Sequence, residues 1–263
     1  MRFPLFQVDA FTDKLFSGNP AAVIPLIRWL RDEILQKIAM ENNLSETAYF
    51  VKTAKGFHIR WFTPKAEVDL CGHATLASAF VLFNELGYKK SVIFFYSRSG
   101  ELSVTKNKNW LTLNFPADKI KKITFSRKYL NCFDLKPLEI YHGKEDVLFI
   151  LKNKKQIETI KPDFEKISQL GMRGVIITTK GSDTDFVSRY FAPAYGINED
   201  PATGSAHTAL TPYWSNRLNK TFMTARQLSE RGAFFKCRHL GERVEISGQG
   251  VLFMKGEIVT NKL

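Results

Sequence analysis

The chain has 263 residues, of which 44% are hydrophobic and 13% aromatic, with 38 lysines and arginines against 26 acidic residues. This composition excludes a disordered low-complexity protein and predicts one large domain or two modest ones. No apolar run reaches the roughly 18–20 residues of a membrane span, and Asp9 interrupts the apolar start that a signal peptide requires, so we expect a cytoplasmic protein with no membrane partner.

The formal net charge of +12 would suit a nucleic-acid-binding protein. The lysines, however, form short scattered groups, as at 119–122 and 152–155, and neither group alternates with aromatic residues. We therefore expect no nucleic-acid partner, and a small anionic substrate that a positive surface would attract. Three widely separated cysteines without a CxxC pair predict neither a disulfide framework nor a zinc site.

The first half of the chain begins with an amphipathic pattern that predicts a helix near residues 29–40. A strand is expected at 58–62, and then a helix at 74–87 that is apolar on nearly all sides and ends at Gly87. Such a helix must be buried, so we expect strands to wrap around it. Further strands are predicted at 91–96, 102–105 and 110–115.

A polar, charged stretch at 116–128 marks the expected boundary between two domains. The second half contains a predicted apolar helix at about 205–214, which includes Pro212. Strands are expected there at 147–151, 174–178, 186–191 and 243–246.

The two halves share a short internal repeat. A constant spacing of 129 positions relates Arg60 to Arg189, Pro64 to Pro193, and Cys71 to Asp200. In both copies a strand ends at a proline, and a polar loop then leads into a run of small residues. The repeat predicts two copies of one supersecondary unit, with a chance match as the alternative because the halves match poorly elsewhere.

The repeated segments place Cys71 and Asp200 near the expected starts of the two helices, with His73 beside the first. A helix N-terminus favours thiolates and carboxylates, and two acid–base groups facing one bound anion suit proton abstraction and return. Taken singly, Cys71 would be a small buried side chain, Asp200 a helix cap and His73 a structural hydrogen-bonding group.

Two other segments have ordinary interpretations from the sequence alone. Glu46, between the first helix and an apparent strand, is expected to be a solvent-facing loop acid. The Gly18-Asn-Pro20 tripeptide is typical of a turn.

At these residues, and over nearly its whole length, the chain resembles the PhzF family of phenazine-biosynthesis-like isomerases, which share the diaminopimelate epimerase fold. The resemblance is carried by blocks in the family's order: Val8-Asp-Ala-Phe-Thr12 with Gly18-Asn-Pro20, Asn42-Asn-Leu-Ser-Glu-Thr47, Arg60-Trp-Phe-Thr-Pro64, Asp69-Leu-Cys-Gly-His-Ala-Thr75, Ser99-Gly100 and Glu199-Asp-Pro-Ala-Thr-Gly-Ser-Ala206.

The resemblance implies an α+β fold of two pseudo-symmetric domains, each a mixed sheet around a central helix, with the active site between them. We expect the domains at residues 1–115 and 116–263, with the strand region beyond about 250 returning to the first. Homodimers occur in the family, so a homodimer is also expected by analogy.

The resemblance further implies a cofactor-independent isomerase without a metal. In the phenazine enzyme a glutamate moves a proton along a diene carboxylic acid, and Glu46 matches that glutamate. His73 and Asp200 match its polar partners. The positions expected to contact substrate are Asn19, Ser45, Cys71, Gly72, Thr203, Gly204 and Ser205.

Two alternatives remain open. The related epimerases use two cysteines at the repeat-equivalent positions, where this chain has Cys71 and Asp200, so an amino-acid racemase or epimerase that uses these two groups is one alternative. The phenazine enzyme lacks a thiol at the position of Cys71, which leaves open whether Glu46 or Cys71 carries the proton. The second alternative is a non-catalytic protein that binds a small ligand.

Overall fold

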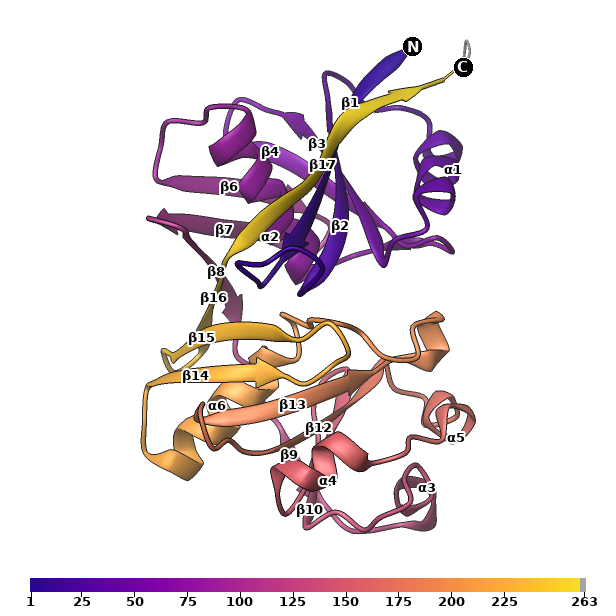
Figure 1. Cartoon of the computed structure of the whole chain (residues 1–263), viewed down its shortest axis with the longest axis vertical. Helices are drawn as coiled ribbons and strands as arrows, with labels where there is room; N and C mark the ends of the chain where they lie inside the picture. Colours follow the sequence, from indigo (N-terminus) through magenta and orange to yellow (C-terminus); the bar gives the residue numbers. More distant parts are fainter. Residues whose placement is uncertain (261–263) are drawn as a thin grey trace. The chain divides into compact units, whose positions relative to one another are not determined.

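The computed structural model describes residues 1–260 and divides into two compact units (Figure 1). The first unit combines Met1–Asn114 with the segment that begins at Ser247, and the second is the continuous stretch Phe115–Ile246. The segment from 247 onward therefore belongs to the first unit, although a division into two halves assigns it to the second. Among residues 1–260, no helix is long and apolar enough to cross a membrane.

The first unit contains β1 (Arg2–Ala10), β2 (Asn19–Leu26), α1 (Asp32–Asn42), β3 (Glu46–Lys52), β4 (Phe57–Phe62), β5 (Glu67–Val68), α2 (Gly72–Phe80), a π-helical turn η1 (Val81–Glu85), β6 (Val92–Ser97), β7 (Gly100–Asn107), β8 (Trp110–Pro116) and β17 (Gly250–Val259). The last of these strands, β17, pairs antiparallel with β1 from Gly250 to Val259 (Figure 1). This pairing explains why the C-terminal strand belongs to the first unit.

The second unit contains β9 (Lys121–Ile123), α3 (Arg127–Leu130), β10 (Glu139–His142), β11 (Asp146–Ile150), α4 (Lys154–Thr159), α5 (Phe164–Ser168), β12 (Gly174–Lys180), β13 (Phe186–Phe191), a 3₁₀ turn η2 (Pro193–Tyr195), α6 (His207–Leu218), β14 (Phe222–Gln227), β15 (Ala233–His239) and β16 (Arg243–Gly248). Strands β8 and β16 each cross a boundary between the two units.

The order of strand pairing is the same in both units. In the first, β1–β2 is antiparallel, β2–β3 parallel, β3–β4 antiparallel, β4–β6 parallel and β6–β7 antiparallel. In the second, the pairs β10–β11, β11–β12, β12–β13, β13–β14 and β14–β15 follow the same alternation. The fold therefore contains the internal repeat that the sequence predicts, and the repeat extends well beyond the matching residues.

Each unit is built around one apolar helix. Eight of the nine residues of α2 are buried, and the helix packs against β1, β2, β3 and β17. The predicted burial of this helix is confirmed. Its α-helical part ends at Phe80, earlier than predicted, because the chain continues into the π-helical turn η1 before reaching Gly87, which has a φ of +66°.

In the second unit, α6 packs against β14 and β15 and contains Pro212. A proline lacks the N–H that would bond to the carbonyl four residues earlier, here that of Thr208. The Thr208 carbonyl instead accepts a hydrogen bond from the backbone N–H of Asp118, at 3.0 Å. The helix therefore continues past Pro212 to Leu218, four residues beyond its predicted end.

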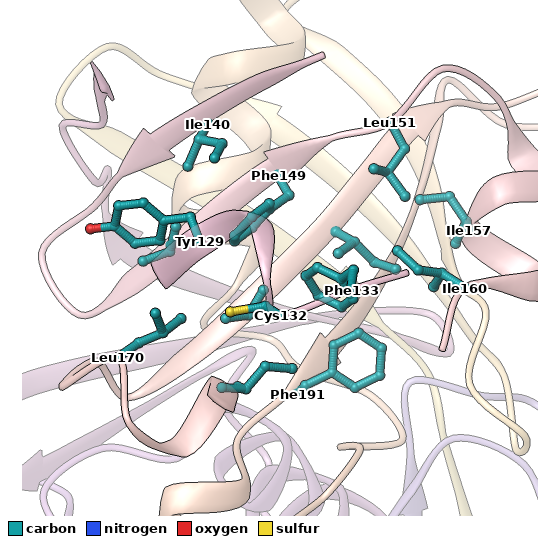
Figure 2. Packing of buried hydrophobic residues seen from close by; sticks show 14 of the residues in the cluster. Tyr129, Cys132, Phe133, Ile140, Phe149, Leu151, Ile157, Ile160, Leu170 and Phe191 are labelled. Carbon is teal, nitrogen blue, oxygen red and sulfur yellow. The ribbon is translucent and has the colours of Figure 1, made fainter. Parts of the chain in front are cut away.

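A second hydrophobic core in the second unit lies among β11, β12, β13 and the short helices (Figure 2). The ring of Phe133 lies 5.3 Å from that of Phe149 and 6.0 Å from that of Phe191, in edge-on or tilted contacts. The first unit has a corresponding core, where α1 buries Leu35 and Ile38 against Tyr49 and Phe62. In both units an apolar core thus packs against the strands that lead to the candidate site, β3 in the first and β13 in the second.

Candidate active site

A carboxylate and an imidazole meet in the first unit. Glu46 is the first residue of β3, and His73 lies in the first turn of α2. Oε2 of Glu46 lies 3.1 Å from Nε2 of His73, and the two side chains are only 12% and 6% exposed. The sequence-based expectation that Glu46 is a solvent-facing loop acid is therefore wrong, because parallel pairing of β3 with β2 carries this residue into the interior.

Two further side chains contact the opposite nitrogen of the same imidazole. The side-chain amide of Asn19 lies 3.2 Å from Nδ1 of His73, and Sγ of Cys71 lies 3.5 Å from it. Asn19 begins β2 and is fully buried. The turn predicted for the tripeptide ends at Gly18, whose φ is +64° and where a Cβ would lie 2.1 Å from the Ala10 carbonyl oxygen. We call Asn19, Glu46, Cys71 and His73 the His73 cluster.

The electrostatics of the His73 cluster favour a protonated imidazole and a neutral thiol. Burial acts to lower the pKa of His73, but the charge of Glu46 and the ring's contact with the Cys71 sulfur outweigh burial and raise this pKa well above its ordinary value. Burial, with the charge of Glu46, raises the pKa of Cys71 to about 11. The sequence-based expectation that a helix N-terminus would favour the Cys71 thiolate is therefore wrong, because desolvation dominates at this site.

Glu46, Cys71 and His73 also have the residue types of a metal site, with ligand atoms within 4.8 Å of one another. Cys71 contacts Nδ1 of the ring, however, and Glu46 contacts Nε2. Cys71 and Glu46 therefore approach this imidazole at opposite nitrogens.

The other predicted positions of the first unit flank this cluster in the chain. Gly72 is buried and is the first residue of α2, directly after Cys71, which occupies the N-cap position without a side-chain capping bond. The first turn of a helix presents backbone N–H groups that can bind an anion, and here that of Ala74 already bonds the side chain of Cys71. Ser45 is half-buried in a bend immediately before β3.

The remaining predicted site residues lie in the second unit, at positions 200–206. We call this segment the Asp200 loop. Asp200 is 7% exposed, and its carboxylate accepts a hydrogen bond from the Thr203 hydroxyl. Gly204 is buried in a turn, and the half-buried Ser205 accepts a bond from the Thr208 hydroxyl through its carbonyl, at 2.7 Å.

The helix that follows this loop starts later than the repeat predicts. α6 begins at His207 with Ala206 at its N-cap, so Asp200 does not cap it. The predicted cap role for Asp200 is wrong, because the chain makes an additional turn at 204–206 before the helix. The constant spacing of 129 positions holds for β4 and β13 but not for the starts of α2 and α6.

Gln227 is a buried residue at the end of β14 that the sequence analysis missed. Its side-chain oxygen accepts a bond from the Thr203 N–H at 2.8 Å, and its nitrogen donates to the Asp200 carbonyl at 2.6 Å. Nothing in the surrounding sequence marks this glutamine, because its role arises from contacts with a loop more than twenty positions away.

The predicted site residues thus fall into two groups. Asn19, Glu46, Cys71 and His73 contact one another within the first unit, and Asp200 and Thr203 contact each other within the second. Within each unit, residues that are distant in sequence converge on one buried polar group.

Comparison with known proteins identifies the family. The family model described as "Phenazine biosynthesis-like protein" matches residues 8–256. An uncharacterized isomerase of Pseudomonas aeruginosa is 46% identical over 258 residues, which cover 98% of this chain and 99% of that protein.

Solved structures agree with this assignment. The crystal structure of a PhzF-family phenazine biosynthesis protein from Enterococcus faecalis matches with a TM-score of 0.95 and 46% identity, covering 99% of this chain and 100% of that one. A hydroxyproline epimerase from Agrobacterium vitis shares the fold at a TM-score of 0.67 and 10% identity, over 98% and 92% of the two chains. The predicted α+β, epimerase-like fold class is confirmed. The chain belongs to the phenazine biosynthesis-like (PhzF) family of isomerases.

Proposed function

We propose that this isomerase acts on a small carboxylate-containing metabolite by removing a proton from carbon and returning it elsewhere, with Glu46 as the base and without a cofactor. The observation that carries this proposal is the contact between Glu46 and His73, at 3.1 Å. A protonated His73 beside the carboxylate supplies a positive charge in a site that excludes most water. Such pairs of buried titratable groups are typical of acid–base catalysis.

In the proposed step, Glu46 takes a proton from a carbon that is α to, or conjugated with, an unsaturated or carbonyl group. The electron pair of that C–H bond moves into the conjugated system, and negative charge develops toward the substrate carboxylate. Backbone N–H groups around Gly72, and around Gly204 and Ser205, would stabilise that charge. Glu46 then returns the proton to another carbon, so that atoms and electrons balance without an oxidant or reductant.

The remaining residues have supporting roles in this proposal. His73 and Asp200 orient the amino or hydroxyl group of the substrate and help to place the proton. The residues that we propose to contact the substrate are Asn19, Ser45, Cys71, Thr203, Gly204 and Ser205. We also propose a homodimer, by analogy with the family.

The test is a panel of small carboxylates and amino acids incubated with the protein in D₂O, followed by mass spectrometry and NMR. Wild type should introduce deuterium into at least one compound, whereas Glu46→Gln should do so at least about 100-fold more slowly, because an essential base contributes on the order of 10²–10⁴-fold. Glu41→Gln, which changes an exposed acid at the end of α1, is the matched control and should behave as wild type. Full turnover by Glu46→Gln would exclude Glu46 as the base.

A racemase or epimerase that uses Cys71 and Asp200 is the second candidate. The 3.5 Å contact between Sγ of Cys71 and Nδ1 of His73 favours it, since a proton could pass between these atoms. In this case deuterium should enter the α-carbon of recovered substrate, and Cys71→Ala should abolish the exchange. A wild-type protein that labels no compound but binds one would instead be a binding protein.

A further inference from the structure

Backbone hydrogen bonds hold the Asp200 loop at both of its ends. At its start the Asp200 N–H donates to the Tyr190 carbonyl at 3.0 Å, and at its end the His207 N–H donates to the Gly204 carbonyl at 3.1 Å. Between these points the chain is neither helix nor strand. Between them, the side chains of Gln227, Ser229 and His207 bond to the carbonyls of Asp200, Pro201 and Thr203.

Gln227 bonds the loop at two residues, Asp200 and Thr203. It is 1% exposed and forms three hydrogen bonds with the loop. The oxygen accepts from the Thr203 N–H, and the nitrogen donates to the Asp200 carbonyl and, at 3.2 Å, to the Thr203 hydroxyl. Both N–H groups of the amide are therefore in use, which also fixes the orientation of the amide.

The third of these bonds controls the direction of a proton. A threonine hydroxyl has one proton to donate. The Thr203 hydroxyl oxygen accepts a hydrogen bond from the Gln227 amide. The proton of the Thr203 hydroxyl is therefore directed to the Asp200 carboxylate. The result is a short chain of hydrogen bonds that runs from the amide through the hydroxyl to the acid.

We propose that Gln227 is a positioning residue for the isomerase reaction, which holds the Asp200 carboxylate in its working orientation through the Thr203 hydroxyl. This inference rests on the proposed function, in which Asp200 acts on the substrate. Gln227 itself is directed at the loop and does not contact the substrate.

Gln227→Glu tests the proposal with almost no change in shape. A carboxylate accepts the Thr203 N–H as before, but it donates nothing and competes with Asp200 for the hydroxyl proton. For the compound that wild type labels fastest in the deuterium panel, kcat should fall about 10- to 100-fold, the effect of losing one hydrogen bond to a charged group. KM should change by less than about threefold, because Gln227 does not bind the substrate.

Ser229→Ala is the matched control. The Ser229 hydroxyl donates to the Pro201 carbonyl at 2.7 Å, so this variant removes a bond to the same loop without affecting Thr203 or the Asp200 side chain. It should retain the kcat of wild type. An equal loss of kcat in Ser229→Ala would show general loosening of the loop and overturn the proposal.

A double-mutant cycle with Thr203→Val tests the route through the hydroxyl. Thr203→Val alone should lower kcat about as much as Gln227→Glu, and adding Gln227→Glu to it should cost less than about threefold more. Full additivity, or full kcat in Gln227→Glu, would overturn the proposal. Because Thr203→Val leaves Gln227 intact, the cycle remains informative even if Gln227→Glu folds poorly.

Amide hydrogen exchange provides a measurement without substrate. The Thr203 N–H should exchange at least about tenfold faster in Gln227→Ala than in wild type or Ser229→Ala, since its acceptor is removed. Unchanged exchange would overturn the proposal. Failure of the proposed function is recognised from two proteins that retain Gln227. Either wild type labels no compound in the deuterium panel, or Glu46→Gln remains fully active. In that case Gln227 only braces the loop, and the inference fails with it.

Discussion

The two repeats hold their strands in the same way and differ where the helix begins. In the first, Arg60 forms two hydrogen bonds with Glu67, at 2.7 and 2.8 Å, and its guanidinium lies 5.1 Å from the ring of Phe62. In the second, Arg189 binds Glu199 through two bonds of 2.7 Å and lies 5.0 Å from the ring of Phe191.

Beyond this shared arrangement the repeats diverge. In the first, α2 starts directly after Cys71, and His73 in its first turn meets Glu46. In the second, position 202, which is 129 residues after His73, is an alanine, and a loop braced by Gln227 precedes α6. The strand and its arginine are thus the part that the two repeats share, whereas the two helix starts carry different polar groups.

The largest expected effect is on the free energy of unfolding, when the contacts of Arg60 or Arg189 are removed. Arg189→Ala should lower the free energy of unfolding by about 3–5 kcal/mol, because Glu199 and the Ile157 carbonyl both lose their bonds to the guanidinium. Arg60→Ala should cost about 1–2 kcal/mol less, since Glu67 keeps a second partner in Arg98, at 2.7 Å. Urea unfolding measures both.

Arg226→Ala is the control for these variants. Its partner is Asp183, and both side chains are about half exposed. The variant should cost about 1 kcal/mol or less. If Arg60→Ala and Arg189→Ala cost no more than this control, the two contacts do not have the structural role assigned to them.

A smaller effect concerns the two buried histidines, His207 and His73, whose contributions to the free energy of unfolding should depend on pH in opposite directions. Burial lowers the pKa of His207 to about 4, against the opposing effect of its bond with the Thr203 carbonyl. In the unfolded chain the pKa of this histidine is near 6.5, so the unfolded state binds a proton more readily than the folded state does. The free energy of unfolding should therefore fall by up to about 3 kcal/mol as the pH drops from about 6.5 to 4. His207→Gln should remove this component of the acid sensitivity.

His73 should show the opposite sign. Because its pKa is raised in the folded protein, its contribution to stability is present below about pH 6.5 and is lost as the pH rises through the folded value. Urea unfolding midpoints of wild type, His73→Gln and His207→Gln, measured from about pH 4 to 9, compare the two. Parallel pH profiles for the two variants would contradict the assigned electrostatics.

The smallest effect concerns the thiol of the first repeat. Since the pKa of Cys71 is about 11, this residue should resist iodoacetamide at neutral pH. Glu46→Gln removes a negative charge that raises this pKa, so alkylation of Cys71 should accelerate by a few-fold. Peptide mass spectrometry follows the reaction, with buried Cys237 as the internal control. No acceleration would show that Glu46 does not act on the thiol.

How far the fold follows from the sequence depends on how local the determining contacts are. Strand β13 was predicted at its observed bounds, since its buried apolar residues are followed by Pro193. Strand β17 was expected only through the family resemblance, because Lys255, Gly256 and Glu257 are exposed and its structure comes from pairing with the distant β1. Local pattern predicts the first kind of strand and not the second.

The candidate site shows the same division. Local chemistry identified Cys71, His73 and Asp200, and the family resemblance added Glu46. Burial of Glu46 and the raised pKa of Cys71 depend on tertiary packing, so the sequence predicted the wrong environment for Glu46 and left Cys71 open between a buried side chain and a thiolate. Gln227 could not be found this way, because a glutamine at the end of a strand has no distinctive local pattern.

The return of β17 to β1 has a consequence for synthesis on the ribosome. The second unit is continuous and its residues are all present once Ile246 has been made. The first unit begins earlier in the chain but lacks a strand until residue 259 has been made. Although N-terminal domains generally fold first during translation, here we expect the later unit to reach its native state before the earlier one. Until then, the edge of β1 that β17 will cover is a surface that chaperones can occupy.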